Sequence, residues 1–212
     1  MKPAPPDHLG DPVQPVGLWN VANVLTMVRL ALVPVFAVLL FHGTGDEGGQ
    51  DAVWRWAAFV VFGVAAATDL VDGELARSRG LVTTFGKVAD PIADKALMGT
   101  ALVGLSILGE LPWWVTVVIL VREVGVTLLR FWVIRDGVIP ASRGGKLKTL
   151  LQGIAIGLFV APLSGWPQTV AEWVMGAAVA VTLVTGADYV GKAVRLHRSA
   201  RAAREHRPAE TG

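Results

Sequence analysis

The chain has 212 residues, of which 53% are hydrophobic and only 17% charged, and its mean hydropathy is +0.53. Soluble domains carry about 25% charged residues, so this composition argues against a soluble enzyme and predicts one compact membrane domain. Because the chain has no cysteine, disulfides, thiolate catalysis and cysteine metal sites are excluded.

Residues 1–20 are rich in proline and lack a long apolar run, so we expect a flexible cytoplasmic lead rather than a signal peptide. Six apolar segments follow, each long enough, or nearly so, to span a bilayer, which takes about 20 residues. They cover residues 21–41, 54–71, 88–109, 111–134, 149–165 and 170–190. Their continuous apolar character indicates helices and not the strands of a barrel. We therefore predict an all-α, polytopic protein whose six transmembrane helices form a domain over residues 21–194.

Basic residues are distributed unevenly between the predicted connections. The connection at 42–52 has no Lys or Arg and that at 164–169 has no charge, whereas those near 75–90 and 135–148 are basic. The positive-inside rule then places both termini in the cytoplasm. The eight tryptophans fall near the predicted span ends, as in an aromatic belt; they are Trp19, Trp54, Trp56, Trp113, Trp114, Trp132, Trp166 and Trp173.

The predicted C-terminal tail, residues 195–212, continues a basic helical stretch that begins at Lys192. After a membrane span, such a stretch favours an anchor on the anionic cytoplasmic leaflet. A nucleic-acid partner is the less favoured interpretation, and we expect none.

Four aspartates lie near the cytoplasmic ends of the second and third segments: Asp69, Asp72, Asp90 and Asp94. Carboxylates at membrane depth are costly and mark a functional site. Their intervals of three and four residues place each pair on one helix face. Four clustered carboxylates would repel one another without a cation, and all-oxygen ligands favour magnesium, manganese or calcium. The alternative is that these aspartates form buried salt bridges with Arg77, Lys87 and Lys95.

Small residues and a cation surround the aspartates. Gly73 and Ala76 share the face of the first pair, Arg77 follows, and Gly86 lies one turn before Asp90. A groove beside carboxylates and a cation suits a phosphate-bearing ligand whose apolar part stays in the lipid. Metal-assisted displacement at phosphorus is the matching chemistry.

Residues 69–94, DLVDGELARSRGLVTTFGKVADPIAD, resemble the CDP-alcohol phosphotransferase signature, D-x-x-D-G-x-x-A-R followed by G-x-x-x-D-x-x-x-D. Four segments resemble patterns of the phosphatidylglycerophosphate synthases: NVANVLTMVRLALVP (20–34), TTFGKVADPIADK (83–95), VREVGVTLLR (121–130) and GGKLKTLLQ (144–152). Two positions, Ala22 and Ala89, depart from those patterns, and both concern packing rather than charge.

The resemblance implies a six-helix homodimer in the cytoplasmic membrane with a cytoplasm-facing site and two Mg²⁺ or Mn²⁺ ions. It implies transfer of a phosphatidyl group from CDP-diacylglycerol to glycerol 3-phosphate, releasing CMP, in phospholipid biosynthesis. Asp69, Asp72 and Asp90 are then expected to hold metal, with Asp94 completing the second site and taking the acceptor's proton. The expected donor-binding residues are Asn23, Thr26, Asp72, Gly73, Ala76, Arg77 and Gly86.

The candidates for binding the acceptor's phosphate are Arg122, Arg130, Lys146 and Lys148. The two lysines lie at the start of a predicted helix, and the N-terminus of a helix favours anions. The two arginines lie about 80° apart around their own helix. Alternatively, Arg122 pairs with Glu123 or Asp188, and the lysines are ordinary positive-inside residues.

Other acceptors and one other class of function stay open. Cardiolipin synthases use phosphatidylglycerol and phosphatidylinositol phosphate synthases use a phosphorylated inositol, but Lys148 favours glycerol 3-phosphate. An ion or proton transporter is a remote alternative, because its acids would lie near the bilayer midplane and not at one membrane edge.

Overall fold

The computed structural model describes residues 21–42, 51–79, 84–133 and 143–205. These residues form six helices and no strand, which confirms the all-α prediction. The helices are α1 (Val21–His42), α2 (Ala52–Arg79), α3 (Thr84–Ile107), α4 (Trp113–Val133), α5 (Arg143–Val160) and α6 (Trp166–Glu205). The predicted lead at 1–20 and the end of the predicted tail, 206–212, lie outside the described residues.

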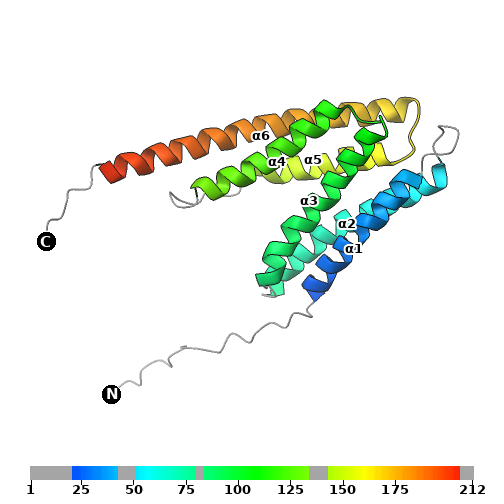
Figure 1. Ribbon diagram of the computed structural model, residues 1–212, viewed down its shortest axis with the longest axis horizontal. Helices are drawn as coiled ribbons and strands as arrows, with labels where there is room; N and C mark the ends of the chain where they lie inside the picture. The colour runs from blue at the N-terminus through cyan, green and yellow to red at the C-terminus, as the bar shows by residue number, and fades with distance from the viewer. Residues whose placement is uncertain (1–20, 43–50, 80–83, 134–142, 206–212) are drawn as a thin grey trace, which may run out of the picture.

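The helices alternate in direction. In Figure 1, α1, α3 and α5 run from left to right, and α2, α4 and α6 return. The start of α1 and the end of α6 therefore lie on the same side, as the charge pattern predicts. We call this end, where α1, α3 and α5 begin and α2, α4 and α6 finish, the site end of the molecule.

Several helices extend at the site end beyond their apolar segments. Helix α2 continues to Arg79, α3 begins at Thr84, α5 begins at Arg143 and α6 continues to Glu205. In α2 and α6 the added turns contain good helix formers such as Glu, Leu, Ala and Arg, so these helices continue where the hydrophobicity has ended. Arg77, which the charge pattern assigned to a loop, is consequently helical.

The hydrophobic core is formed by buried side chains from all six helices. Leu40 of α1 and Leu102 of α3 are buried in it, and the rings of Phe36 and Phe62 lie 5.7 Å apart between α1 and α2. Gly104 of α3 allows close approach to α1, because a Cβ there would lie 2.6 Å from Cδ2 of Leu40. Close helix contact through small residues is typical of packing in membranes.

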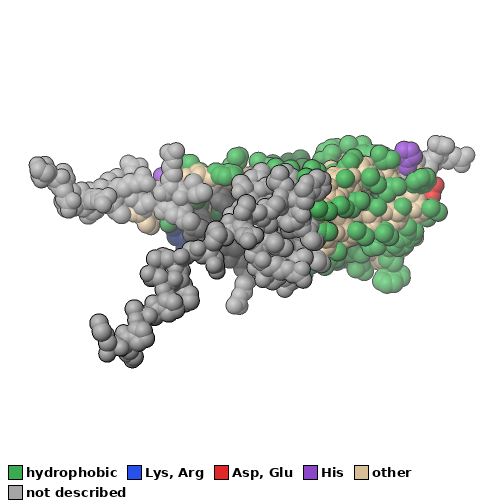
Figure 2. All heavy atoms as spheres, turned by 90° about the horizontal axis from the view of Figure 1, so that it is seen from below, with side chains coloured by type: hydrophobic (Ala, Val, Ile, Leu, Met, Phe, Trp, Pro, Cys, Tyr) green, Lys and Arg blue, Asp and Glu red, His purple; other side chains and the backbone are tan. Residues whose placement is uncertain are grey.

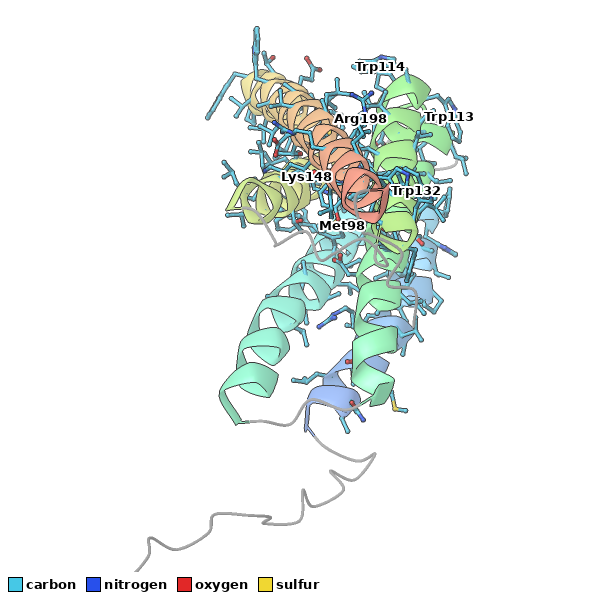
Figure 3. All side chains as sticks on the ribbon, turned by 90° about the vertical axis from the view of Figure 1, so that its left-hand side faces the viewer. Met98, Trp113, Trp114, Trp132, Lys148 and Arg198 are labelled. Carbon is cyan, nitrogen blue, oxygen red and sulfur yellow. The ribbon has the colours of Figure 1, made fainter. Side chains whose placement is uncertain are left out.

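Large apolar side chains also cover the outside of the helices. Figure 2 shows hydrophobic side chains over most of the described surface on the face it presents. Every described tryptophan is exposed, and Figure 3 shows Trp113 and Trp114 together at the start of α4. An apolar exterior is costly in water but suits a lipid environment.

Two helical stretches, Asn23–His42 and Trp166–Ser199, are long and apolar enough by themselves to cross a membrane. Shorter apolar stretches cover Ala52–Thr68 and Leu147–Val160. Helices α3 and α4 carry charged residues such as Asp94, Lys95 and Glu123, which interrupt their hydrophobicity near the site end.

The two described connections opposite the site end are short. Gly109, between α3 and α4, and Gly165, between α5 and α6, have φ angles of 74° and 66°. Only glycine adopts this left-handed conformation without steric cost, so the chain reverses direction within a few residues at both places.

Candidate active site

The four aspartates are carried by two helix segments at the site end. Asp69 and Asp72 belong to the second half of α2, and Asp90 and Asp94 to the first half of α3. These segments lie beside the start of α1 (Figure 1, Figure 3). The backbone is helical through both pairs, which is the condition for the shared helix face that the spacing predicts.

Of these four aspartates, Asp94 is the one whose side chain is described, and it is half-buried. The other predicted residues of this region have side chains outside the described part of the chain; they are Asp69, Asp72, Gly73, Ala76, Arg77, Gly86 and Asp90. Their helices are described, and these place all of them at the site end.

A row of buried polar residues lies on one face of α1 at the site end. Asn23, Thr26 and Arg29 have exposed fractions of 1%, 2% and 1%. Nε of Arg29 donates to the carbonyl of Ala65 on α2 at 3.3 Å, one turn before Asp69. Burial of polar groups is costly unless they are hydrogen-bonded, so this row turns toward the aspartate-bearing segments and not toward lipid.

A cavity of about 180 Å³ lies between α3, α4 and α5. Its polar wall is formed by Asp94, Lys95, Glu123, Lys148, Thr149 and Gln152. Its apolar wall includes Met98, whose position near Lys148 is labelled in Figure 3. The cavity therefore brings together the predicted base, Asp94, and one predicted phosphate ligand, Lys148.

The ammonium group of Lys148 on α5 pairs with the carboxylate of Glu123 on α4. Lys148 is only 3% exposed. Oε1 of Glu123, which accepts from Lys148, also lies 3.2 Å from Nη1 of Arg122. One carboxylate oxygen thus joins two of the predicted phosphate-binding cations.

Arg122 itself is not among the described residues that line the cavity. Its Nη2 donates to the hydroxyl of Thr185 on α6 at 3.1 Å, and a Cβ at Gly186 would lie 3.1 Å from its Cγ. Of its two predicted alternative partners, Glu123 is the one found, since Asp188 pairs instead with Lys192 at 2.6 Å.

Lys95 donates to the hydroxyl of Thr127 at 2.6 Å, and that hydroxyl donates to the carbonyl of Glu123 at 2.8 Å. In the described part of the chain, therefore, Lys95 is bonded to α4 and not to an aspartate. The other two cations of the salt-bridge alternative, Arg77 and Lys87, have side chains outside the described residues.

Two predicted acceptor residues are placed by their helices alone. Arg130 lies in the last turn of α4 and Lys146 in the first turn of α5, and the side chains of both lie outside the described residues. Sequence reasoning did not assign Glu123 and Gln152 to the site. Both occupy motif segments already noted, 121–130 and 144–152, and that position was the available signal.

Comparisons with known proteins agree with the motifs. A profile described as CDP-alcohol phosphatidyltransferase matches residues 19–184. A relative in Mycobacterium tuberculosis (strain ATCC 25618 / H37Rv), named "Probable phosphatidylglycerophosphate synthase", is 57% identical over 83% of this chain and 82% of its own length. A Bacillus subtilis (strain 168) relative, named "CDP-diacylglycerol--glycerol-3-phosphate 3-phosphatidyltransferase", is 36% identical over 82% of this chain and 95% of its own. A relative of the same name in Rickettsia typhi (strain ATCC VR-144 / Wilmington) is 35% identical over 80% and 94%.

Proposed function

Because this chain belongs to the CDP-alcohol phosphatidyltransferase family, we propose that it transfers the phosphatidyl group of CDP-diacylglycerol to glycerol 3-phosphate. The products are phosphatidylglycerophosphate and CMP, and the reaction belongs to phospholipid biosynthesis. The names of the relatives support this donor and acceptor. The observation that carries the proposal is the cavity in which Asp94 and Lys148 lie together.

The donor atoms available at the aspartate-bearing helices fit a hard divalent cation, because they are carboxylate oxygens and the chain has no cysteine. Asp69, Asp72 and Asp90, with Asp94, would hold two Mg²⁺ or Mn²⁺ ions. Such ions would neutralise charge on the diphosphate of the donor and on the leaving CMP.

Two residues that line the cavity have separate roles in the reaction of the acceptor. Lys148 binds the phosphate of glycerol 3-phosphate, and Asp94 takes the proton from its primary hydroxyl. The freed oxygen attacks the phosphorus that carries diacylglycerol, and the bond from that phosphorus to the CMP oxygen breaks. A positioned base of this kind contributes about 10²–10⁴-fold to a rate.

The donor is proposed to bind along α1 and α2. Asn23 and Thr26 lie on the buried face of α1, and Gly73, Ala76 and Arg77 belong to the facing end of α2. This arrangement would hold the nucleotide at the site end while the acyl chains remain beside the apolar exterior. Arg122, Arg130 and Lys146 complete the proposed acceptor site.

The chain belongs to a membrane-protein family and has apolar helices, so it is an integral membrane protein. We further propose that it lies in the cytoplasmic membrane, with both termini and the site in the cytoplasm, and that it forms a homodimer. The basic extension of α6 supports the orientation. The mass of the detergent-solubilised protein, measured by light scattering, tests the dimer.

An acceptor panel tests the reaction. Purified protein receives CDP-diacylglycerol and magnesium, and CMP release is followed with glycerol 3-phosphate, inositol 1-phosphate or phosphatidylglycerol. Release with glycerol 3-phosphate alone is the expected result. Release with another acceptor would keep the donor but refute the acceptor, and release with none would refute the proposed reaction.

A further inference from the structure

We propose that Glu123 is a positioning residue for the acceptor: its carboxylate holds the Lys148 ammonium group at the cavity wall, ready for the acceptor's phosphate. This inference rests on the proposed function. It assigns a role to a residue that neither donates a proton nor bears the positive charge expected of a phosphate ligand.

The first argument comes from the hydrogen-bonding capacity of Lys148. Its ammonium group has three donors, and within the described part of the chain its side chain is bonded to Glu123 alone. Two donors therefore remain for a ligand in the cavity that Lys148 lines. Glu123 therefore restrains the ammonium group without using all of its hydrogen-bond donors.

The second argument concerns burial. Lys148 is almost wholly buried, and an ammonium group in such a place is costly without a counter-charge. Glu123 supplies that charge before any acceptor binds. Its own position is restrained by Nη1 of Arg122 at 3.2 Å, while Arg122 is bonded to Thr185 of α6.

The third argument concerns the competing acid in the same cavity. Asp94 lines the cavity together with Lys148 and Glu123. Among the described residues that line this cavity, Glu123 and Asp94 are the two that carry a carboxylate. Because Glu123 is bonded to Lys148, the ammonium group has a counter-charge other than the proposed base.

These arguments predict a specific kinetic signature. In Glu123→Gln the lysine is no longer held before binding, so KM for glycerol 3-phosphate should rise about tenfold, as for loss of a charge-assisted hydrogen bond. At saturating acceptor the bound phosphate itself attracts Lys148. Both kcat and KM for CDP-diacylglycerol should thus stay within about threefold of the wild type.

The experiment is a double-mutant cycle of Glu123→Gln and Lys148→Met. Because Glu123 acts through Lys148, adding Glu123→Gln to Lys148→Met should change KM for glycerol 3-phosphate by less than about twofold. Glu123→Asp, which keeps the carboxylate, should restore KM to within about threefold of the wild type. Glu172→Gln, at an exposed glutamate on α6, is the matched control, and melting temperatures in detergent check folding.

Three results would overturn the inference: an unchanged KM in Glu123→Gln, a fall in kcat at unchanged KM, or effects that multiply in the double variant. Failure of the proposed function is a separate result, namely absence of wild-type turnover with glycerol 3-phosphate. In that case the same proteins are compared by calorimetric titration with glycerol 3-phosphate, and equal affinities of wild type and Glu123→Gln refute the role of Glu123.

Discussion

Nη2 of Arg55 lies 2.6 Å from Oε2 of Glu110, at the end of the molecule opposite the candidate active site. The side chain of Arg55 is wholly buried, whereas that of Glu110 is 21% exposed. Nη2 also donates to the carbonyl of Phe159 at 2.9 Å. A single guanidinium group thus joins the first turn of α2, the α3–α4 connection and the end of α5.

This asymmetry in burial predicts unequal effects of removing the two partners. Glu110→Gln leaves a buried guanidinium without its counter-charge, which costs about 3–5 kcal/mol. Arg55→Met removes the buried charge, including Nε and Nη1, which have no hydrogen-bond partner among the described residues, and leaves a glutamate that reaches solvent. Thermal unfolding in detergent should therefore show the larger loss for Glu110→Gln; a larger loss for Arg55→Met would contradict this account.

The contact between α1 and α3 predicts a steric effect at Gly104. A Cβ there would lie 2.6 Å from Cδ2 of Leu40, which is fully buried and has little room to move. Gly104→Ala should cost about 1–3 kcal/mol as an overpacked core. Gly176→Ala on α6 is the control, because its added Cβ would meet no described atom within 4 Å beyond its own helix backbone and chain neighbours, and it should be neutral or stabilising. Equal melting temperatures for the two variants would refute the close approach.

The proposed base predicts a loss of turnover without a loss of donor binding. Asp94→Asn keeps the size of the side chain but cannot accept the proton, so kcat should fall by about 10²–10⁴-fold. Binding of CDP-diacylglycerol, measured by equilibrium titration, should remain detectable. Asp188→Asn is the control, since Asp188 pairs with Lys192 at the surface, and such pairs contribute little. Normal turnover by Asp94→Asn would show that another group is the base.

The carboxylate cluster predicts dependence on a divalent cation. Treatment with a chelator should abolish CMP release, and added Mg²⁺ or Mn²⁺ should restore it. Asp69→Asn, Asp72→Asn and Asp90→Asn should each raise the cation concentration needed for half-maximal activity. Full activity after exhaustive chelation would refute the metal site, whatever the acceptor.

The absence of cysteine permits a direct test of orientation. Ser164, between α5 and α6, and Ser199, near the end of α6, are both exposed. In intact cells, a membrane-impermeant maleimide should label Ser164→Cys but not Ser199→Cys. Ser199→Cys should be labelled after permeabilisation. The reverse pattern would invert the proposed topology.

Much of the fold could be predicted because membrane helices follow local rules. Continuous apolar segments and alternating basic connections predicted six antiparallel helices, and the structure contains all six. The helix ends were predicted less well. Hydrophobicity stops near residue 71, but the helix of Asp69 and Asp72 continues to Arg79, since helix propensity and not hydrophobicity decides where a helix ends.

Residue types at fixed spacing identify the family and place the four aspartates along the chain, because both are local properties of single helices. Which cations share a site depends on how the helices pack, and the structure is needed to see it. Arg122 and Lys148 were equivalent candidates by charge, yet Lys148 lines the cavity and Arg122 reaches α6. Their common partner, Glu123, is recognised from the structure, where it pairs with Lys148 of α5, because an ion pair between helices depends on their relative placement and not on local sequence.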